Sequence, residues 1–382
     1  MKAGYKVWDT DTHCRPSWET LEPYFDANLK ARLPELQKYK RLNKKDIEGL
    51  VVGNHGFELG ARIPYPRFLG KAEPEPGLHR PETTFMGTRH ATTGAMDHDP
   101  VVRLKDMDEE GVDVQLIIGG MPNAFHLDDT ELQVGLMRAY NRYLNDFCAA
   151  DPHRLKAVLP VGPDSVEDCV AEIKRWGKTP WAVGVYVQMK NDTPMDHPKM
   201  EPIWKAVDEL GLVVIHHSNY MSPPYFPGCY DLWENAFLGR SCAHPWGAMR
   251  AVGSFIGCGA MDRYKSLRFG ILESGFGWLP FWMRRLEDQV HYVGAVAELQ
   301  HKVTDYMTGG RFFSSIEMSE GQDMVRMVSE FMGPDVLMYA SDYPHMECRF
   351  PNSVDHFMSW KLDDGLRRKL FWDNPVRFYG EP

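Results

Sequence analysis

The segment Val7-Trp8-Asp9-Thr10-Asp11-Thr12-His13 predicts a buried strand that ends in acidic and imidazole side chains. Its first two residues have high β-propensity. Alternate side chains of a strand point the same way, so we expect Asp9, Asp11 and His13 to share one face. Burying these groups together is costly unless a charge compensates them, and a divalent cation would do so because both types are ordinary metal ligands. A turn cap and a locally hydrogen-bonded histidine would explain so short a motif equally well.

Strands and helices alternate along most of the remaining chain. Counting the first segment, the predicted strands are residues 7–13, 114–118, 155–161, 182–187, 212–217, 267–273, 312–316 and 336–341. The predicted helices are residues 101–110, 130–150, 165–176, 202–210, 246–261, 279–299, 321–332 and 363–371. Mostly apolar strand cores indicate parallel strands buried on both faces. The pattern predicts an α/β fold, a (β/α)8 (TIM) barrel with its active site at the carboxyl ends of the strands. A doubly wound open sheet is the alternative, although no Gly-rich nucleotide fingerprint follows any strand.

One long segment interrupts this alternation. Residues 51–100 are dense in Gly, Pro, His and Arg and have no clear periodicity. Their aromatic residues favour an ordered, lid-like insertion after the first strand over a disordered linker. We therefore expect residues 1–382 to form a single barrel domain with this insertion, because α/β barrels of such length occur as one unit.

Composition narrows the possible partners and the compartment. The chain has a net charge of −10 and a pI near 5.8, without a basic cluster, so nucleic acid and anionic membranes are not expected partners. We find neither an apolar run of membrane-spanning length nor a signal peptide. The 7 cysteines are scattered and lack a C-x-x-C pair, which indicates reduced thiols. We expect a cytoplasmic protein.

Four predicted strands finish in metal-type residues. A core histidine, a helix cap or a turn former would explain each one separately. Because the carboxyl ends of barrel strands meet at one rim, their combination predicts a metal site there. The residues are Asp11, His13, His216, His217, Glu273 and Asp342.

The same segments resemble the amidohydrolase superfamily, particularly the branch of metal-dependent hydrolases and non-oxidative decarboxylases of aromatic acids. The matching phrases are D-T-D-T-H at 9–13, E-L-G-L-V-V-I-H-H at 209–217, L-E-S-G-F-G-W-L-P at 272–280, S-D-Y-P-H at 341–345 and D-N-P-V-R at 373–377. The resemblance implies a barrel with a divalent cation at the strand ends, with zinc as the first choice and manganese or iron as alternatives. It also implies a homodimer, because tight dimers are usual in that family.

In register with that family, the implied metal ligands are Asp11, His13, His217 and Asp342, and the last also serves as proton shuttle. Glu273 stands where many members carry a substrate-contacting histidine. We expect His244 to supply that imidazole from a neighbouring loop. Glu273 also leaves room for a second, bridged metal ion, although one ion is favoured.

The main functional expectation is a metal-dependent hydrolase of an ester, thioester, amide or activated C–C bond. The cation would activate water, Asp342 would move its proton, and His244 or Glu273 would polarise the carbonyl. The first alternative is a non-oxidative decarboxylase of an aromatic acid, in which Asp342 protonates the ring carbon and Arg15, Arg62 or Arg67 faces the carboxylate. The second is a metal-free barrel that binds a small molecule.

Aromatic side chains near the predicted strand ends suggest a hydrophobic or aromatic small-molecule substrate. The predicted substrate contacts are Arg15, Trp18, Trp246 and Trp278. Packing of the inserted segment onto the barrel would explain these aromatic residues equally well.

Overall fold

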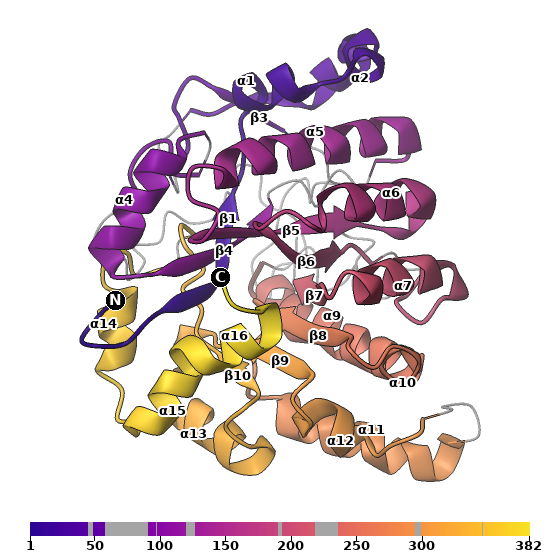
Figure 1. The fold of residues 1–382 in the computed structure, drawn as a ribbon, viewed down its shortest axis with the longest axis vertical. Coiled ribbons are helices and arrows are strands. Elements are labelled where there is room, and N and C mark those ends of the chain that lie inside the picture. Colours follow the sequence, from indigo (N-terminus) through magenta and orange to yellow (C-terminus); the bar gives the residue numbers. More distant parts are fainter. Residues whose placement is uncertain are drawn as a thin grey trace, which may run out of the picture.

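The computed structural model describes residues 1–44, 49–57, 91–96, 98–119, 127–189, 193–217, 236–294, 299–345 and 347–382. Within them, a sheet of 8 parallel strands pairs in the order β1-β4-β5-β6-β7-β8-β9-β10. The strands are β1 (Trp8–Cys14), β4 (Val114–Gly119), β5 (Leu155–Val161), β6 (Ala182–Val187), β7 (Val213–His217), β8 (Arg268–Leu272), β9 (Phe312–Ser315) and β10 (Leu337–Met338). Figure 1 shows these strands surrounded by helices.

The sheet closes on itself between β1 and the segment that follows β10. The backbone amides of Thr10 and His13 donate to the carbonyl oxygens of Tyr339 and Tyr343 at 3.1 and 2.7 Å. The result is a nearly closed barrel, which confirms the predicted (β/α)8 architecture over the open doubly wound sheet.

The helices of the described chain cover the outside of the barrel. The longer ones are α4 (Pro100–Glu110), α5 (Thr130–Cys148), α6 (Val166–Trp176), α7 (Glu201–Glu209), α9 (Ala236–Gly257), α11 (Leu279–Val293) and α13 (Gly321–Met332). The shorter ones are α1 (Trp18–Leu21), α2 (Ala27–Ala31), α3 (Leu33–Leu36), α10 (Ala260–Arg263), α12 (Val303–Thr308), α14 (Ser353–Met358), α15 (Asp364–Arg368) and α16 (Asn374–Tyr379). None of the helices in these described ranges has the length and apolar character needed to cross a bilayer.

Local sequence explains where the helices begin and end, as α4 illustrates. The Asp99 side chain caps it by accepting hydrogen bonds from the amides of Val101 and Val102, and Pro100 occupies the first turn. The helix ends at Gly111, whose φ of 86° suits a residue without a Cβ atom.

Aromatic side chains fill the amino-terminal end of the barrel. The rings of Trp8 and Tyr379 stack with centroids 5.5 Å apart, and Phe378 packs so closely on Gly270 that a Cβ atom there would lie 2.6 Å from the ring. With this end filled by α16, the strand ends available for chemistry are the carboxyl ends, as the barrel prediction requires.

Several predicted boundaries differ from the structure. The sixth strand ends one residue before Glu273, which adopts a left-handed φ of 44°. The last strand is limited to β10, and Asp342 beyond it has a left-handed φ of 60°. Helix α9 begins well before the predicted residue 246 and includes Pro245. The antiparallel pair β2 (Lys40–Leu42) and β3 (His55–Phe57) was not predicted. Residues 58–90 of the predicted lid lie outside the described residues, so the lid stays a prediction.

The prediction that Asp9 shares a face with Asp11 and His13 is wrong. The pairing of β1 with β4 shifts between Asp9 and Thr12, and such a bulge inverts the alternation of side chains. Asp9 accepts hydrogen bonds from both the amide and the hydroxyl of Ser341. It therefore supports the barrel closure rather than the rim.

Arg103 of α4 joins the end of β1 to its surroundings. This fully buried guanidinium donates to the carbonyl oxygens of His13 and Ala95 and to Oε1 of Gln115, and it lies 4.6 Å from the centre of the Tyr343 ring. Removing it would leave buried acceptors without donors.

We predict that Arg103→Met lowers the free energy of unfolding by about 2–4 kcal/mol, because buried carbonyl oxygens lose their partners. Urea denaturation measures this change. The matched control is Arg368→Met, whose side chain is 72% exposed, with an expected effect of less than about 0.5 kcal/mol. Equal effects of the two substitutions would contradict the assigned role of Arg103.

Glu110, the last residue of α4, is buried against α14 and accepts a hydrogen bond from the amide of Val354 at 2.8 Å. Burial raises the pKa of this carboxyl from 4.5 to about 7, although the bond to the backbone opposes the shift. The folded protein therefore binds more protons than the unfolded chain between these two values. Its stability should fall as pH rises through this window.

We predict that Glu110→Gln removes this loss of stability. Between pH 4.5 and pH 8, the free energy of unfolding of the variant should rise relative to that of the wild type by on the order of 3 kcal/mol. Urea denaturation across this range measures the gain, and the exposed Glu330→Gln serves as the control for the loss of one carboxylate. Parallel pH curves for wild type and Glu110→Gln would show that the carboxyl does not titrate in this window.

Candidate metal centre

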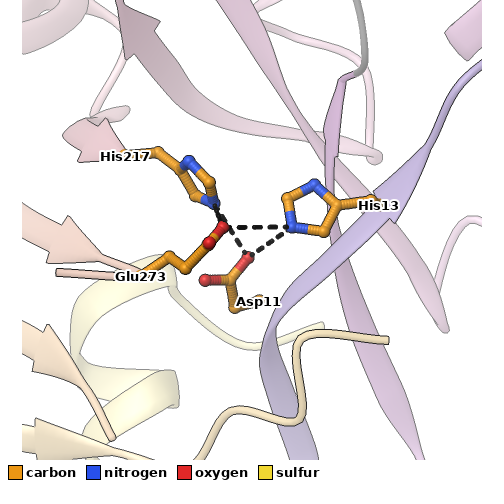
Figure 2. Close-up of side chains that lie close together, drawn as sticks. All are labelled: Asp11, His13, His217 and Glu273. Atoms are coloured by element: carbon orange, nitrogen blue, oxygen red, sulfur yellow. Dashed lines mark ion pairs between the residues drawn. The ribbon is translucent and has the colours of Figure 1, made fainter. Parts of the chain in front are cut away.

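Five side chains from four parts of the barrel converge at its carboxyl end. Asp11 and His13 come from β1, His217 is the last residue of β7, Glu273 follows β8, and Asp342 follows β10. Figure 2 shows the first four pointing toward one another. The structure therefore brings together five of the six predicted strand-end residues, whereas His216 is in neither group of possible ligands among the described residues.

The donor atoms are within a few ångströms of one another. Oδ1 of Asp11 lies 3.4 Å from Nε2 of both His13 and His217. Nε2 of His217 lies 3.0 Å from Oε2 of Glu273, and Nε2 of His13 lies 3.0 Å from Oδ1 of Asp342. The ligand atoms of Asp11, His13, His217 and Glu273 all lie within 4.8 Å of one another, which suits ligands of one cation.

Burial of these atoms supports a bound cation. Asp11, His13, His217 and Asp342 are each at most 6% exposed, and each has an inward-facing atom without a hydrogen-bond partner among the described residues. These atoms are Oδ1 of Asp11, Nε2 of His13, Nε2 of His217 and Oδ2 of Asp342. Buried polar atoms almost always have partners, so their convergence fits a divalent metal ion.

Two overlapping groups of possible ligands share His13 and Glu273. One adds Asp11 and His217, and the other adds Asp342 and His345. His13 can offer only its Nε2 atom to either group, because its other ring nitrogen, Nδ1, lies 3.3 Å from the carbonyl oxygen of Ile118. One nitrogen cannot ligate two ions, so this arrangement favours a single ion.

The electrostatic environment of the cluster also favours binding of a cation. Burial raises the pKa of Asp11 and of Asp342 above the usual range of a carboxyl group. Burial lowers the pKa of His217, but the carboxylates of Asp11 and Glu273 outweigh this effect and raise it above its usual value. For His13, burial and the neighbouring imidazoles lower the pKa, which favours the neutral form that binds metal.

The backbone at the two carboxylates is held in an uncommon conformation. Left-handed φ values at Glu273 and Asp342 cost roughly 1–3 kcal/mol each and occur mostly at functional sites. The amide of Glu273 donates to the hydroxyl of Ser315 at 3.0 Å, and the Glu320 carboxylate accepts from the amides of Phe276 and Gly277. These bonds position the turn that carries Glu273.

Further ionisable side chains surround the ligands. Nδ1 of His345 lies 2.7 Å from Oδ1 of Asp342, and its ring stacks on that of His13 at 4.0 Å. Nδ1 of His244 lies 3.8 Å from Oε1 of Glu273, although His244 belongs to α9 and not to a loop. Burial raises the pKa of Glu317, and the nearby carboxylate of Glu273 raises it further.

The predicted substrate contacts are not gathered in one place. Trp18 is 1% exposed and stacks on Phe57 at 5.1 Å, whereas Trp246 is 44% exposed on α9. The indole of Trp278 donates to the carbonyl oxygen of Ser274. Arg15 is exposed, and its charge contributes to lowering the pKa of His13. Their contact with substrate stays a prediction, and Arg62 and Arg67 lie outside the described residues.

Sequence reasoning missed three side chains at the site. His345 was visible in the S-D-Y-P-H phrase but received no role. Gln188 and Glu317 lie just beyond the ends of β6 and β9, where alternation along the strand could have pointed to them.

Comparison with known proteins identifies the family. The amidohydrolase family model matches residues 10–380. The chain belongs to this family. The membership confirms the resemblance based on the strand-end phrases.

Several of the similar proteins are named as decarboxylases of aromatic acids. The gamma-resorcylate decarboxylase of Rhodococcus jostii (strain RHA1) is 25% identical over 283 residues, which cover 68% of this chain and 79% of that protein. The structure of 5-carboxyvanillate decarboxylase from Sphingomonas paucimobilis matches with a TM-score of 0.68 at 19% identity, over 98% of this chain and 99% of that one. A dihydroxybenzoic acid decarboxylase from Polaromonas sp. JS666, solved with manganese and the inhibitor 2-nitroresorcinol, has a TM-score of 0.67 at 16% identity, over 98% and 97%.

These relatives correct the main functional expectation. Hydrolysis as the main activity is wrong, because the relatives that align with two thirds of this chain are named as decarboxylases of aromatic acids. The physical reason is that the strand-end ligands serve both chemistries. A cation held by such ligands could activate water or bind an acid, so the ligand pattern does not distinguish between the two.

We predict about one equivalent of divalent metal per chain in protein purified without chelator, and loss of that metal in His217→Ala. Elemental analysis measures both. His153→Ala is the matched control, because His153 is exposed and precedes β5 at the opposite end of the barrel. Two equivalents in the wild type would contradict the single-ion site, and full retention in His217→Ala would remove His217 from the ligand set.

Proposed function

We propose that this protein is a metal-dependent, non-oxidative decarboxylase of an aromatic acid that carries a hydroxyl group beside the carboxylate. The metal dependence rests on the buried, unsatisfied ligand atoms of Asp11, His13, His217 and Asp342, and the choice of decarboxylation over hydrolysis rests on the named relatives. The substrate is a small molecule, and no further partner is needed for this chemistry.

The metal ion would be held by Asp11, His13, His217 and Asp342, with Glu273 as an additional carboxylate ligand. Three carboxylates beside two imidazoles suit manganese as well as zinc. The manganese in the dihydroxybenzoic acid decarboxylase makes it the first ion to test. When bound, the ion supplies a positive charge that attracts the carboxylate and hydroxyl oxygens of the acid.

Asp342 is proposed as the proton donor. Burial raises the pKa of its carboxyl group, which favours proton binding, and its Oδ1 lies 2.7 Å from Nδ1 of His345. Asp342 transfers its proton to the ring carbon that bears the carboxylate. The bond to the carboxylate then breaks, its electrons return to the ring, and carbon dioxide leaves. The reaction consumes one proton, and His345, in contact with Asp342, is placed to restore it from solvent.

Two further side chains receive roles in binding the substrate and in positioning the metal ligands. Arg15 carries a positive charge near His13. Of the three predicted arginines it is the one within the described residues, so it is our candidate for attracting the carboxylate of the substrate. His244 contacts Glu273 and fixes its orientation, so we assign it a positioning role. A homodimer stays a prediction.

The test is a decarboxylation assay on manganese-loaded protein with 2,6-dihydroxybenzoate, 5-carboxyvanillate and 2-hydroxybenzoate. We expect release of carbon dioxide from at least one acid, and in D2O one deuterium should appear on the carbon that lost the carboxylate. Chelation should abolish the activity. The absence of carbon dioxide from every acid with fully loaded protein would contradict the proposal.

We predict that Asp342→Asn lowers kcat by about 100-fold or more, the usual contribution of a general acid. Metal analysis of the variant separates loss of proton transfer from loss of the ion. Asp323→Asn is the control, since Asp323 is 89% exposed and pairs only with Arg326 among the described residues. An Asp342→Asn variant that binds metal and turns over at the wild-type rate would exclude Asp342 as the proton donor.

A further inference from the structure

Gln188 extends β6 at the carboxyl end of the barrel. Its amide donates to the carbonyl oxygen of Val161 at 2.8 Å, so the pairing of β6 with β5 continues through this residue. Tyr186, two residues earlier, belongs to the cluster of side chains that fills the barrel interior. Because side chains alternate along a strand, Gln188 faces the interior in the layer above Tyr186.

This layer adjoins the metal centre. The ring of Tyr186 lies edge-on to that of His217, with centroids 5.7 Å apart, and its hydroxyl donates to the carbonyl oxygen of His217 at 3.4 Å. The charges of His217, Glu273 and Asp11 all act on the pKa of the Tyr186 phenol, which burial raises. Gln188 thus lies beside the ligand from β7, on the side of the barrel mouth away from Asp342 and β10.

The Nε2 donor of Gln188 is unpaired within the part of the chain that the structure describes. The residue is 5% exposed, and its Nε2 has no hydrogen-bond partner among the described residues. It lies close enough to the Tyr186 phenol to oppose the effect of burial on that pKa, yet the geometry of a hydrogen bond from Nε2 is not met. An unsatisfied buried donor costs about 1–3 kcal/mol, so one kept beside a binding site points to an acceptor on a ligand.

Other buried amides of the chain are used differently. Nε2 of Gln133 donates to Asp164 at 3.2 Å, and Nδ2 of Asn141 donates to Glu172 at 2.9 Å. Both lie on α5, outside the barrel, and connect it to the next βα unit. Gln188 differs from them in facing the barrel mouth with its donor unused.

We propose that Gln188 determines substrate specificity by donating a hydrogen bond to an oxygen substituent on the ring of the aromatic acid, other than the oxygens held at the metal. This inference rests on the proposed function for its substrate class. A neutral donor suits the position, because a lysine or arginine would pair with the carboxylates of the centre and compete with the cation. A site built around such a donor rejects the analogue that lacks the acceptor, since the donor then stays unpaired.

The test compares Gln188→Leu with the wild type and with Gln133→Leu, all loaded with manganese. Isothermal titration measures the dissociation constants of 2,6-dihydroxybenzoate and of 2-hydroxybenzoate, which lacks one ring hydroxyl. In Gln188→Leu we expect binding of the first acid to weaken about 10-fold or more and binding of the second to change little. In Gln133→Leu, which lies outside the site, both constants should match the wild type.

Thermal unfolding without ligand provides the second readout. Replacing an unsatisfied donor by an apolar side chain of similar size should leave the melting temperature of Gln188→Leu unchanged or raise it, whereas Gln133→Leu should lower it. If Gln188→Leu lowers the melting temperature as much as Gln133→Leu does, the Gln188 amide has a structural partner and the assignment is overturned. Unchanged binding of both acids by Gln188→Leu, or no binding of either acid by the wild type, would overturn it too.

These outcomes are separate from those of the proposed function. Wild-type protein that binds 2,6-dihydroxybenzoate but releases no carbon dioxide would contradict the decarboxylase proposal alone. A Gln188→Leu variant that decarboxylates both acids as the wild type does, with equal metal content, would contradict the role of Gln188 alone.

Discussion

The gathering of three carboxylates and two imidazoles at the carboxyl end of the barrel is the constraint on which the rest of the structure depends. Asp11, His13, His217, Glu273 and Asp342 leave separate strand ends, yet their donor atoms lie within hydrogen-bonding or ion-pair distance. Removing so many polar groups from water is costly, and four of their inward-facing atoms have no hydrogen-bond partner in the described chain. A divalent cation satisfies them together, so the site is built for a ligand that the polypeptide does not itself provide.

The barrel supports this cluster with polar contacts on its outer side. Arg103 binds the carbonyl oxygen of His13, and Asp9 binds Ser341, one residue before Asp342. Glu320 holds the turn after Glu273 by accepting from two backbone amides. Each of these residues secures the backbone next to a metal ligand. A rigid scaffold of this kind is what keeps such ligands in position before the ion and the substrate arrive.

The structure explains why the pattern of ligands led to the expectation of hydrolysis. The motif residues are the candidate metal ligands, and the same ligand types serve hydrolysis and decarboxylation. In our proposal, substrate selection depends on an inward-facing side chain just beyond them, Gln188. This residue belongs to no short motif, because its position depends on alternation along a strand whose end the sequence locates only approximately. Relatives that align over most of the chain therefore carried information that the ligand pattern lacked.

The amino-acid sequence by itself determined the barrel and the ligand positions, because strand periodicity and strand-end residues are local properties. It correctly placed Asp11, His13, His217 and Asp342 at one rim. Tertiary structure alone decided the rest. The bulge in β1 turned Asp9 away, and His345 stacked on His13. The left-handed turn carried Glu273 into the cluster of ligands. These features arise from pairing between strands and from packing between distant segments, which no local pattern encodes.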